Sequence, residues 1–387
     1  MSSRSKLNWL IVLSLLTGNL GFIGCAPSFA PDIDQRIGSI TDPYEFSIPE
    51  WELNTLLHEL WESLKPATVT RTEDVETVRE YFELIEKGTT PSQDLENTVE
   101  RILTRQITRT LFEEGIINPL DTYLPLNIVF PPLNFEFQSP PHLLIISPRD
   151  EIRLLRRTTL EPGLTTSERE TIESRVDSQD ISSLVVGLGG VGFTYPTMVV
   201  ESSNIRRTIE RITEEWFHQY LVFQPMGLLY ALDAVGWRSD YDIIVMNETF
   251  AGIVSKEIGA RVYQKYYALE GESTTSENSV SEFYSLMREI RIRVDEYLAQ
   301  GKVDEAEEFM QESRDFLASK GYHIRKLNQA YFAFYGTYAD KPDVPSSIGQ
   351  DLQKLRQQSS SLKEFTDRVK GMKSPSDLSK AVEGIEE

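Results

Sequence analysis

Residues 205–220 constrain the fold more than any other stretch, because their apolar side chains recur at the spacing of an α-helix. A helix turns about 100° per residue, so the following side chains form one apolar stripe: Ile205, Ile209, Ile212, Trp216 and Tyr220. Arg207, Glu214 and His218 fall on the opposite side of this helix. The simplest interpretation is an amphipathic helix whose polar side faces solvent.

A second stretch, residues 244–263, also has helical spacing. In a helix, Glu248 shares a face with apolar and small side chains: Ile244, Ala251, Ser255, Ile258 and Val262. A carboxylate buried without a partner costs several kcal/mol or takes up a proton. A metal ion, a histidine or an arginine would each satisfy it, and Ser255 on the same face leaves a structural explanation open.

The sequence EWFH at 215–218, followed by NETFA at 247–251, resembles the gluzincin metallopeptidases. That family carries HExxH on one helix and an NExxA-type stretch on the next. Two histidines and the later glutamate bind zinc there, and the glutamate after the first histidine activates the water. The resemblance implies that Glu215 is the general base and that His218 and Glu248 are metal ligands. It also implies a peptide or protein as substrate or ligand.

The first histidine of that pattern is replaced by Glu214, so the motif here is EExxH. From i to i+4, Glu214 can share a metal ion with His218, which gives a Glu214, His218 and Glu248 ligand set. Two carboxylates and one imidazole should weaken zinc binding and favour manganese or a similar ion. The substitution predicts weak or absent zinc peptidase activity. It leaves open a catalytically inactive binding or structural protein of the cell envelope, with no metal.

Residues 322–338 are rich in aromatic side chains, most of which we expect in the core of a helix. Arg325, Asn328 and Tyr331 share one face of that helix. Zincin peptidases commonly use a tyrosine or an arginine to stabilise the oxyanion. The resemblance therefore makes Tyr331 or Tyr338 the candidate for this catalytic role.

The chain is strongly acidic, with 387 residues and a formal net charge of −21. This charge argues against nucleic acid or an anionic membrane surface as a partner. The 40% of hydrophobic residues is enough for a sizeable core. The chain has four histidines, so a metal site made only of histidines would need residues from distant segments: His58, His142, His218 and His323.

The first 25 residues are typical of an export signal. Arg4 and Lys6 form a basic start, residues 9–24 carry no charge, and the only cysteine follows at Cys25. Residues 22–25, FIGC, resemble a bacterial lipobox, which implies that Cys25 carries a lipid anchoring the protein to a membrane outside the cytoplasm. A cleavable signal ending near Ala26 and an uncleaved anchor are the alternatives, although the uncharged stretch is short for a membrane span.

The glycine-rich sequence GLGGVG at 187–192 satisfies the G-x-G-x-x-G pattern of dinucleotide-binding loops. In those loops the glycines open a helix directly after a strand. Here Pro196 follows four residues later and prevents such a helix from continuing. The sequence therefore predicts a glycine-rich turn or bulge between strands, and the resemblance to peptidases suggests that its backbone lines a substrate cleft.

The predicted fold class is α+β and predominantly helical, with a zincin-like small sheet preceding a metal-site helix pair and a C-terminal helical region. Short β-prone runs predict strands at 127–130, 135–137, 143–146, 184–186 and 198–200, interrupted by a helix over 166–177. Other helices are predicted over residues 51–64, 75–85, 95–114, 228–235, 280–300, 303–320, 322–338 and 350–372.

The predicted organisation has five parts. Residues 1–25 form the signal segment, and 26–45 a tether rich in proline, aspartate and serine. Residues 46–200 contain the N-terminal helices and the small sheet, and 201–340 form the zincin-like helical domain. Residues 341–387 contain a linker, a terminal helix and a frayed acidic tail.

Overall fold

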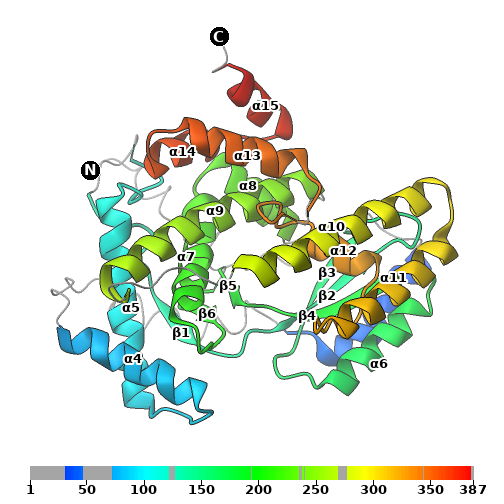
Figure 1. Cartoon of the computed structure of the whole chain (residues 1–387), viewed down its shortest axis with the longest axis horizontal. Coiled ribbons are helices and arrows are strands. Elements are labelled where there is room, and N and C mark those ends of the chain that lie inside the picture. The colour runs from blue at the N-terminus through cyan, green and yellow to red at the C-terminus, as the bar shows by residue number, and fades with distance from the viewer. Residues whose placement is uncertain are drawn as a thin grey trace, which may run out of the picture.

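The computed structural model describes residues 31–46, 72–121, 127–192, 194–234, 238, 240–268, 277–342 and 344–384. This part of the chain has an α+β fold dominated by helices (Figure 1). The predicted export segment with Cys25 and the helix predicted over residues 51–64 lie outside the described residues. Among the helices described, none combines the length and the apolar character that a membrane crossing requires.

The first described element, helix α2 (Pro31–Thr41), corrects part of the predicted tether. Its Ile37 is fully buried and Ile40 is 5% exposed, and both belong to an apolar cluster with Ile172 of helix α6 (Thr166–Asp177). The many polar residues of this segment suggested an extended linker. Burial of two isoleucines on one helical face is nevertheless enough to dock α2. The 3-10 turn η1 (Asp42–Tyr44) follows α2.

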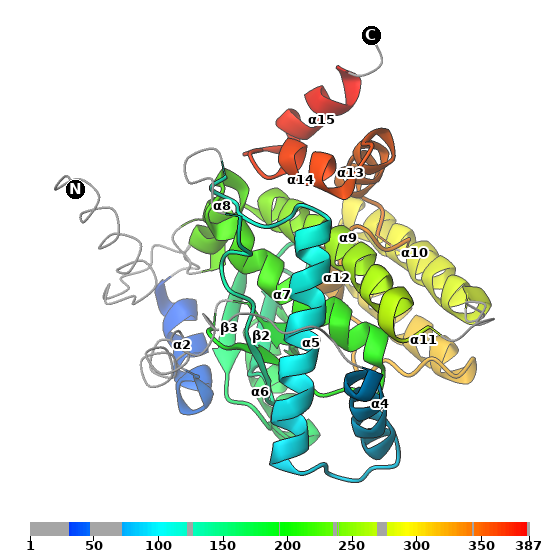
Figure 2. The ribbon, with the colours of Figure 1, turned by 90° about the vertical axis from the view of Figure 1, so that its left-hand side faces the viewer.

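Two predicted N-terminal helices are confirmed as α4 (Thr72–Glu86) and α5 (Gln93–Glu113). The side chain of Ser92 accepts a hydrogen bond from the Leu95 N–H and thereby caps the start of α5. Helix α5 packs against both α4 and α9 (Figure 2).

The predicted small sheet is instead two sheets of three strands each. In the first, β2 (His142–Ser147) lies between β3 (Arg156–Leu160) and β4 (Ser182–Gly187), and both pairings are antiparallel. In the second, β6 (Thr197–Val199) pairs in parallel with β1 (Phe135–Phe137) and antiparallel with β5 (Gly190–Val191).

The strand predictions contain one error and two omissions. Residues 127–130 are not a strand, because the two prolines that follow at 131 and 132 have no N–H group to continue a ladder. Strand β3, Arg156–Leu160, was not predicted since its two arginines and two threonines hide the apolar alternation. The predicted glycine-rich turn is confirmed at residues 188–189, between the end of β4 at Gly187 and the start of β5. The second omission is β5 itself, because Gly190–Val191 was predicted as part of this turn.

Helices α7 (Ile205–Val222), α8 (Pro225–Ala234) and α9 (Tyr241–Tyr266) form the centre of the molecule. The predicted apolar stripe of α7 is buried from Ile209 to Tyr220, with Trp216 1% exposed, whereas Ile205 at the start of the helix is partly buried. The opposite side of α7 is not simply solvated, because α8 and α9 pack against this helix and His218 is only 6% exposed. Residues 243–252 of α9 are all buried, which places α9 inside the fold.

The C-terminal region begins with the predicted helix pair, α10 (Glu277–Ala299) and α11 (Val303–Ser319). They are joined by a turn in which Gly301 has φ +70°, a conformation that favours glycine. The helix predicted over residues 322–338 is shorter, since α12 covers only Gln329–Tyr335. It starts where the Asn328 side chain accepts a hydrogen bond from the Tyr331 N–H.

The prediction of one terminal helix and a frayed tail is wrong. Helices α13 (Ser347–Gln358) and α14 (Leu362–Val369) are separate, because Ser361 caps the start of α14 by accepting from the Glu364 N–H. The expected tail contains α15 (Pro375–Glu383), whose Leu378 is fully buried in the main core. Its acidic composition hid this short apolar face.

Candidate metal centre

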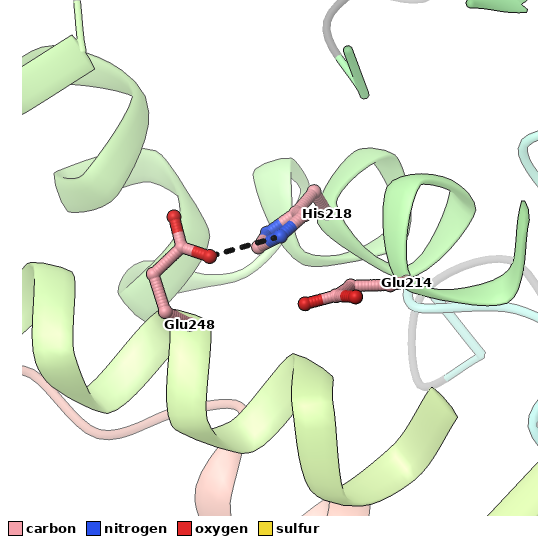
Figure 3. Close-up of side chains that lie close together, drawn as sticks. All are labelled: Glu214, His218 and Glu248. Atoms are coloured by element: carbon pink, nitrogen blue, oxygen red, sulfur yellow. Dashed lines mark ion pairs between the residues drawn. The ribbon is translucent and has the colours of Figure 1, made fainter. Parts of the chain in front are cut away.

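The structure brings Glu214, His218 and Glu248 together (Figure 3). Glu214 and His218 lie one turn apart on α7, and Glu248 lies on the neighbouring α9. One ligand atom from each side chain lies within 4.8 Å of the others, and His218 Nε2 is 3.7 Å from Glu248 Oε2. Ligands bind zinc at about 2.0–2.2 Å, so two atoms on one ion are at most about 4.4 Å apart. Small side-chain movements would therefore close this cluster on an ion.

His218 is oriented by Asn247, the residue before Glu248. His218 Nδ1 lies 2.8 Å from Asn247 Oδ1, and Asn247 is fully buried. Because an amide oxygen is an acceptor, this contact assigns the ring proton to Nδ1. The lone pair of Nε2 then faces the Glu248 carboxylate. Two acceptors facing each other in a buried site call for a proton or a cation between them.

Tyr230 of α8 fixes the other oxygen of Glu248. Its hydroxyl donates a hydrogen bond of 2.6 Å to Glu248 Oε1. Its ring stacks on the His218 ring, with centroids 5.4 Å apart and an angle of 14° between the planes. Tyr230 therefore touches both candidate ligands. Sequence reasoning missed it because nothing in the spacing of α8 links this residue to α7 or α9.

Burial and neighbouring carboxylates hold protons on the site. Burial, then Glu248 and Asp340, raise the pKa of Glu214 to about 8, against smaller opposing effects of Lys341 and Lys256. The pKa of Glu215 is also well above its usual value, because of burial first and then Glu214 and Glu248. A divalent cation would reverse this balance by favouring the charged carboxylates.

The glycine-rich turn lies directly against this part of α7. A Cβ atom on Gly190 would lie 2.6 Å from the Glu215 side chain, and one on Gly192 would lie 2.7 Å from the Glu215 carbonyl oxygen. Only glycine tolerates such an approach without displacement of the turn. The Gly192 N–H also donates to the Glu215 carboxylate, which opposes the rise in its pKa. The turn thus fixes the orientation of the candidate general base.

The two candidate tyrosines have different positions. Tyr338 lies in the electrostatic range of the cluster, because its pKa is raised well above the usual value by burial and then by Glu248 and Glu214. The segment before and after it is held on α9 by Thr249, whose hydroxyl donates to the Thr337 carbonyl and accepts from the Ala339 N–H. The ring of Tyr331 instead packs on Tyr335, with centroids 4.4 Å apart.

Arg325, which shared the predicted helical face with Tyr331, has a structural partner. It donates two hydrogen bonds to the buried carboxylate of Glu173, at 2.8 and 2.5 Å. This pairing raises the pKa of Arg325. The arrangement ties the segment before α12 to helix α6 and leaves Tyr338 as the candidate nearest to the metal ligands.

The fold and this cluster define an α+β protein with a buried Glu/His/Glu candidate metal centre between two core helices. No family model matches the sequence, and neither the curated proteins nor the solved structures contain a significant match.

Metal binding is expected to strengthen as the pH rises from about 6 to 8. Glu214 must lose its proton to act as a ligand, and its pKa of about 8 keeps that proton bound at lower pH. For each proton that metal binding displaces, the metal affinity rises about tenfold per pH unit. This rise should level off above the pKa of Glu214. Calorimetric titrations with manganese across this range measure it. A flat profile would contradict a proton held by Glu214.

Proposed function

We propose that this chain is a metal-dependent hydrolase of peptide bonds, with Glu214, His218 and Glu248 as metal ligands. The observation that supports the proposal best is the position of the buried His218 Nε2, which lies 3.7 Å from Glu248 Oε2 with Glu214 beside it. The zincin-like character of the fold belongs to the same proposal. It is supported by the pairing of α7 with α9 and by the glycine-rich turn against the EExxH segment.

The donor set fits a divalent cation, and its two carboxylates favour manganese or a similar ion over zinc. When bound, such an ion would polarise a peptide carbonyl and make a nearby water more acidic. Asn247 and Tyr230 hold the His218 ring and the Glu248 carboxylate in place. Ligands that are already held in position need little reorganisation to bind an ion. Removing the contacts that hold them commonly lowers the metal affinity about 10- to 100-fold.

Glu215 has the role of general base in this proposal. Its carboxylate takes a proton from the attacking water and passes it to the leaving amine. The hydrogen bond from the Gly192 N–H keeps the carboxylate oriented. Tyr338 keeps its phenolic proton because its pKa is raised, so its hydroxyl can donate to the developing oxyanion.

Replacing Glu215 by glutamine is expected to lower peptide hydrolysis about 100- to 10,000-fold while leaving manganese binding nearly unchanged. The amide has nearly the same shape as the carboxyl group but cannot accept the proton. Purified wild type and Glu215→Gln are incubated with a mixed peptide library and manganese, and cleavage is followed by mass spectrometry. Calorimetry on both proteins provides the binding control.

A catalytically inactive binding protein is the second candidate. The presence of Glu214 at the first ligand position favours it, because this carboxyl group holds a proton at neutral pH and must lose it before it can bind a metal ion. In that case wild type would bind manganese and cleave no peptide. Failure to bind either manganese or zinc would overturn the metal centre itself.

A further inference from the structure

A cavity of 640 Å³ lies between strand β4, helices α6, α7 and α10, and the segment at 321–326. These elements can be followed in Figure 1. Five of its lining side chains are basic or histidine: Arg169, Arg207, His323, Arg325 and Lys326. None of the described residues that line it is acidic, although the whole chain carries a net charge of −21.

Two of these cations are already neutralised. Arg325 and Lys326 pair with Glu173 and Asp177 of α6. Arg207 is exposed, and it forms no ion pair with any residue that the structure describes. The Arg169 Nε is buried and has no hydrogen-bond partner in the described part of the chain. The cavity therefore has cationic donors in excess of its anionic partners, which suits an anionic ligand.

Arg207, the residue of α7 that lines the cavity, lies on the same side of this helix as the metal ligands. Arg207 precedes Glu214 by two helical turns, so both side chains project from one side of the helix. Seven residues correspond to about 10 Å along a helix, which is the length of about three residues of extended peptide. A peptide bound beside Glu214 and His218 can thus reach the cavity with a nearby residue.

The edge of β4 limits how such a peptide can bind. The Val185 N–H donates to Glu173 and its carbonyl accepts from Arg325, while the Ser183 carbonyl accepts from Asn328. These side chains occupy the outward positions where a peptide strand would pair. Backbone groups of alternate residues face the same edge, so Gly187 is the next outward position. It is exposed, and a Cβ there would meet nothing within 4 Å.

We propose that this cavity binds a peptide carboxylate through Arg207 and Arg169, and selects substrates with a carboxylate about three residues from the cleaved bond. The selection of substrates rests on the proposed function, whereas the binding of a carboxylate does not. An acidic side chain and a C-terminal carboxylate supply the same chemistry. The peptide would run along Gly187 and end where the edge of β4 is occupied by Arg325 and Asn328.

Three acetylated tetrapeptides of alanine with a variable last residue test the proposal. One ends in glutamine with a free carboxylate, one in glutamate amide, and one in glutamine amide. Their affinities for the full chain carrying Glu215→Gln are measured by calorimetry, without metal and with manganese. At least one peptide with a carboxylate is expected to bind about tenfold more tightly than the neutral peptide, as a charge-assisted contact predicts. The stronger binder identifies the source of the carboxylate.

The double substitution Arg169→Gln and Arg207→Gln is expected to remove this preference. Arg101→Gln, on the exposed surface of α5, is the matched control and should leave the preference unchanged. Equal affinity for all three peptides, or no binding at all, would overturn the proposal. If a peptide with a carboxylate binds more tightly but the wild type hydrolyses no peptide, the proposed function is refuted and the carboxylate site stands. If the wild type hydrolyses peptides but all three test peptides bind equally, the carboxylate site is refuted and the proposed function stands.

Discussion

Replacing Glu214 by histidine is expected to raise the zinc affinity of the protein by at least about tenfold, a change typical of altered metal-site ligation. The variant presents two imidazoles and one carboxylate, a set that zinc prefers to two carboxylates and one imidazole. It also removes a carboxyl group whose pKa of about 8 makes it compete for protons at neutral pH. Competition titrations with a zinc indicator at pH 7 measure the change.

Glu214→Gln is the matched control for this substitution. It removes the carboxylate but adds no nitrogen ligand, because an amide is a poor metal donor. Zinc affinity should therefore rise in Glu214→His and fall in Glu214→Gln. Equal affinities in the two variants would show that the residue at position 214 does not contact the metal.

The histidine variant also tests the balance between the two candidate functions. With one carboxylate fewer, like-charge repulsion at Glu215 decreases and its pKa moves toward the usual value. If the wild type is an inactive relative of a hydrolase, zinc-dependent cleavage should appear or increase in Glu214→His. Strong zinc-dependent cleavage by the wild type would mean that the loss of the first histidine has little effect on catalysis.

Replacing Gly349 by alanine is expected to destabilise the protein by about 3 kcal/mol or more. A Cβ atom at this position of α13 would lie 1.9 Å from the Ala339 carbonyl oxygen. The backbone at Ala339 is itself held on α9 by the Thr249 hydroxyl, so it cannot move freely. The clash should exceed the gain of about 1 kcal/mol that alanine usually brings to a helix. Urea denaturation measures the difference.

Gly38→Ala in α2 is the matched control, because Gly38 is also helical and its nearest new contact would be Asp42 Oδ1 at 3.6 Å. This variant should be neutral or slightly more stable. Gly349→Ala should also weaken the site, since Ala339 lies between Tyr338 and Asp340, which both interact electrostatically with Glu214. Unchanged stability in Gly349→Ala would contradict the packing of α13 on this segment.

Local sequence patterns predicted the elements that carry the candidate ligands. The spacing of Ile209, Ile212 and Trp216 defined the buried side of α7, and the residues around Glu248 defined a buried face of α9. Helix α6 has the predicted bounds, and its start is fixed by a complete capping box, in which Thr165 and Glu168 bond each other's backbone. These signals lie within a few residues of one another along the chain.

The contacts that complete the site come from segments that are distant in sequence. Tyr230 reaches Glu248 from α8, and Gly192 reaches Glu215 from a turn between strands. Periodicity showed that Glu248 faces inward, but it could not show which side chains it would meet there. Helix packing decided this, because the same face of a helix can be covered by any partner of suitable shape.

The sequence by itself therefore predicted the helices that carry the candidate ligands, the buried sides of these helices and the presence of a carboxylate that needs a partner. Only the tertiary structure decided that the polar side of α7 is covered, that His218 and Glu248 face each other, and that α2 and α15 are docked rather than loose. The physical reason is the range of the interactions. Hydrogen bonds within a helix and its caps act over a few residues, whereas burial depends on the packing of the whole chain.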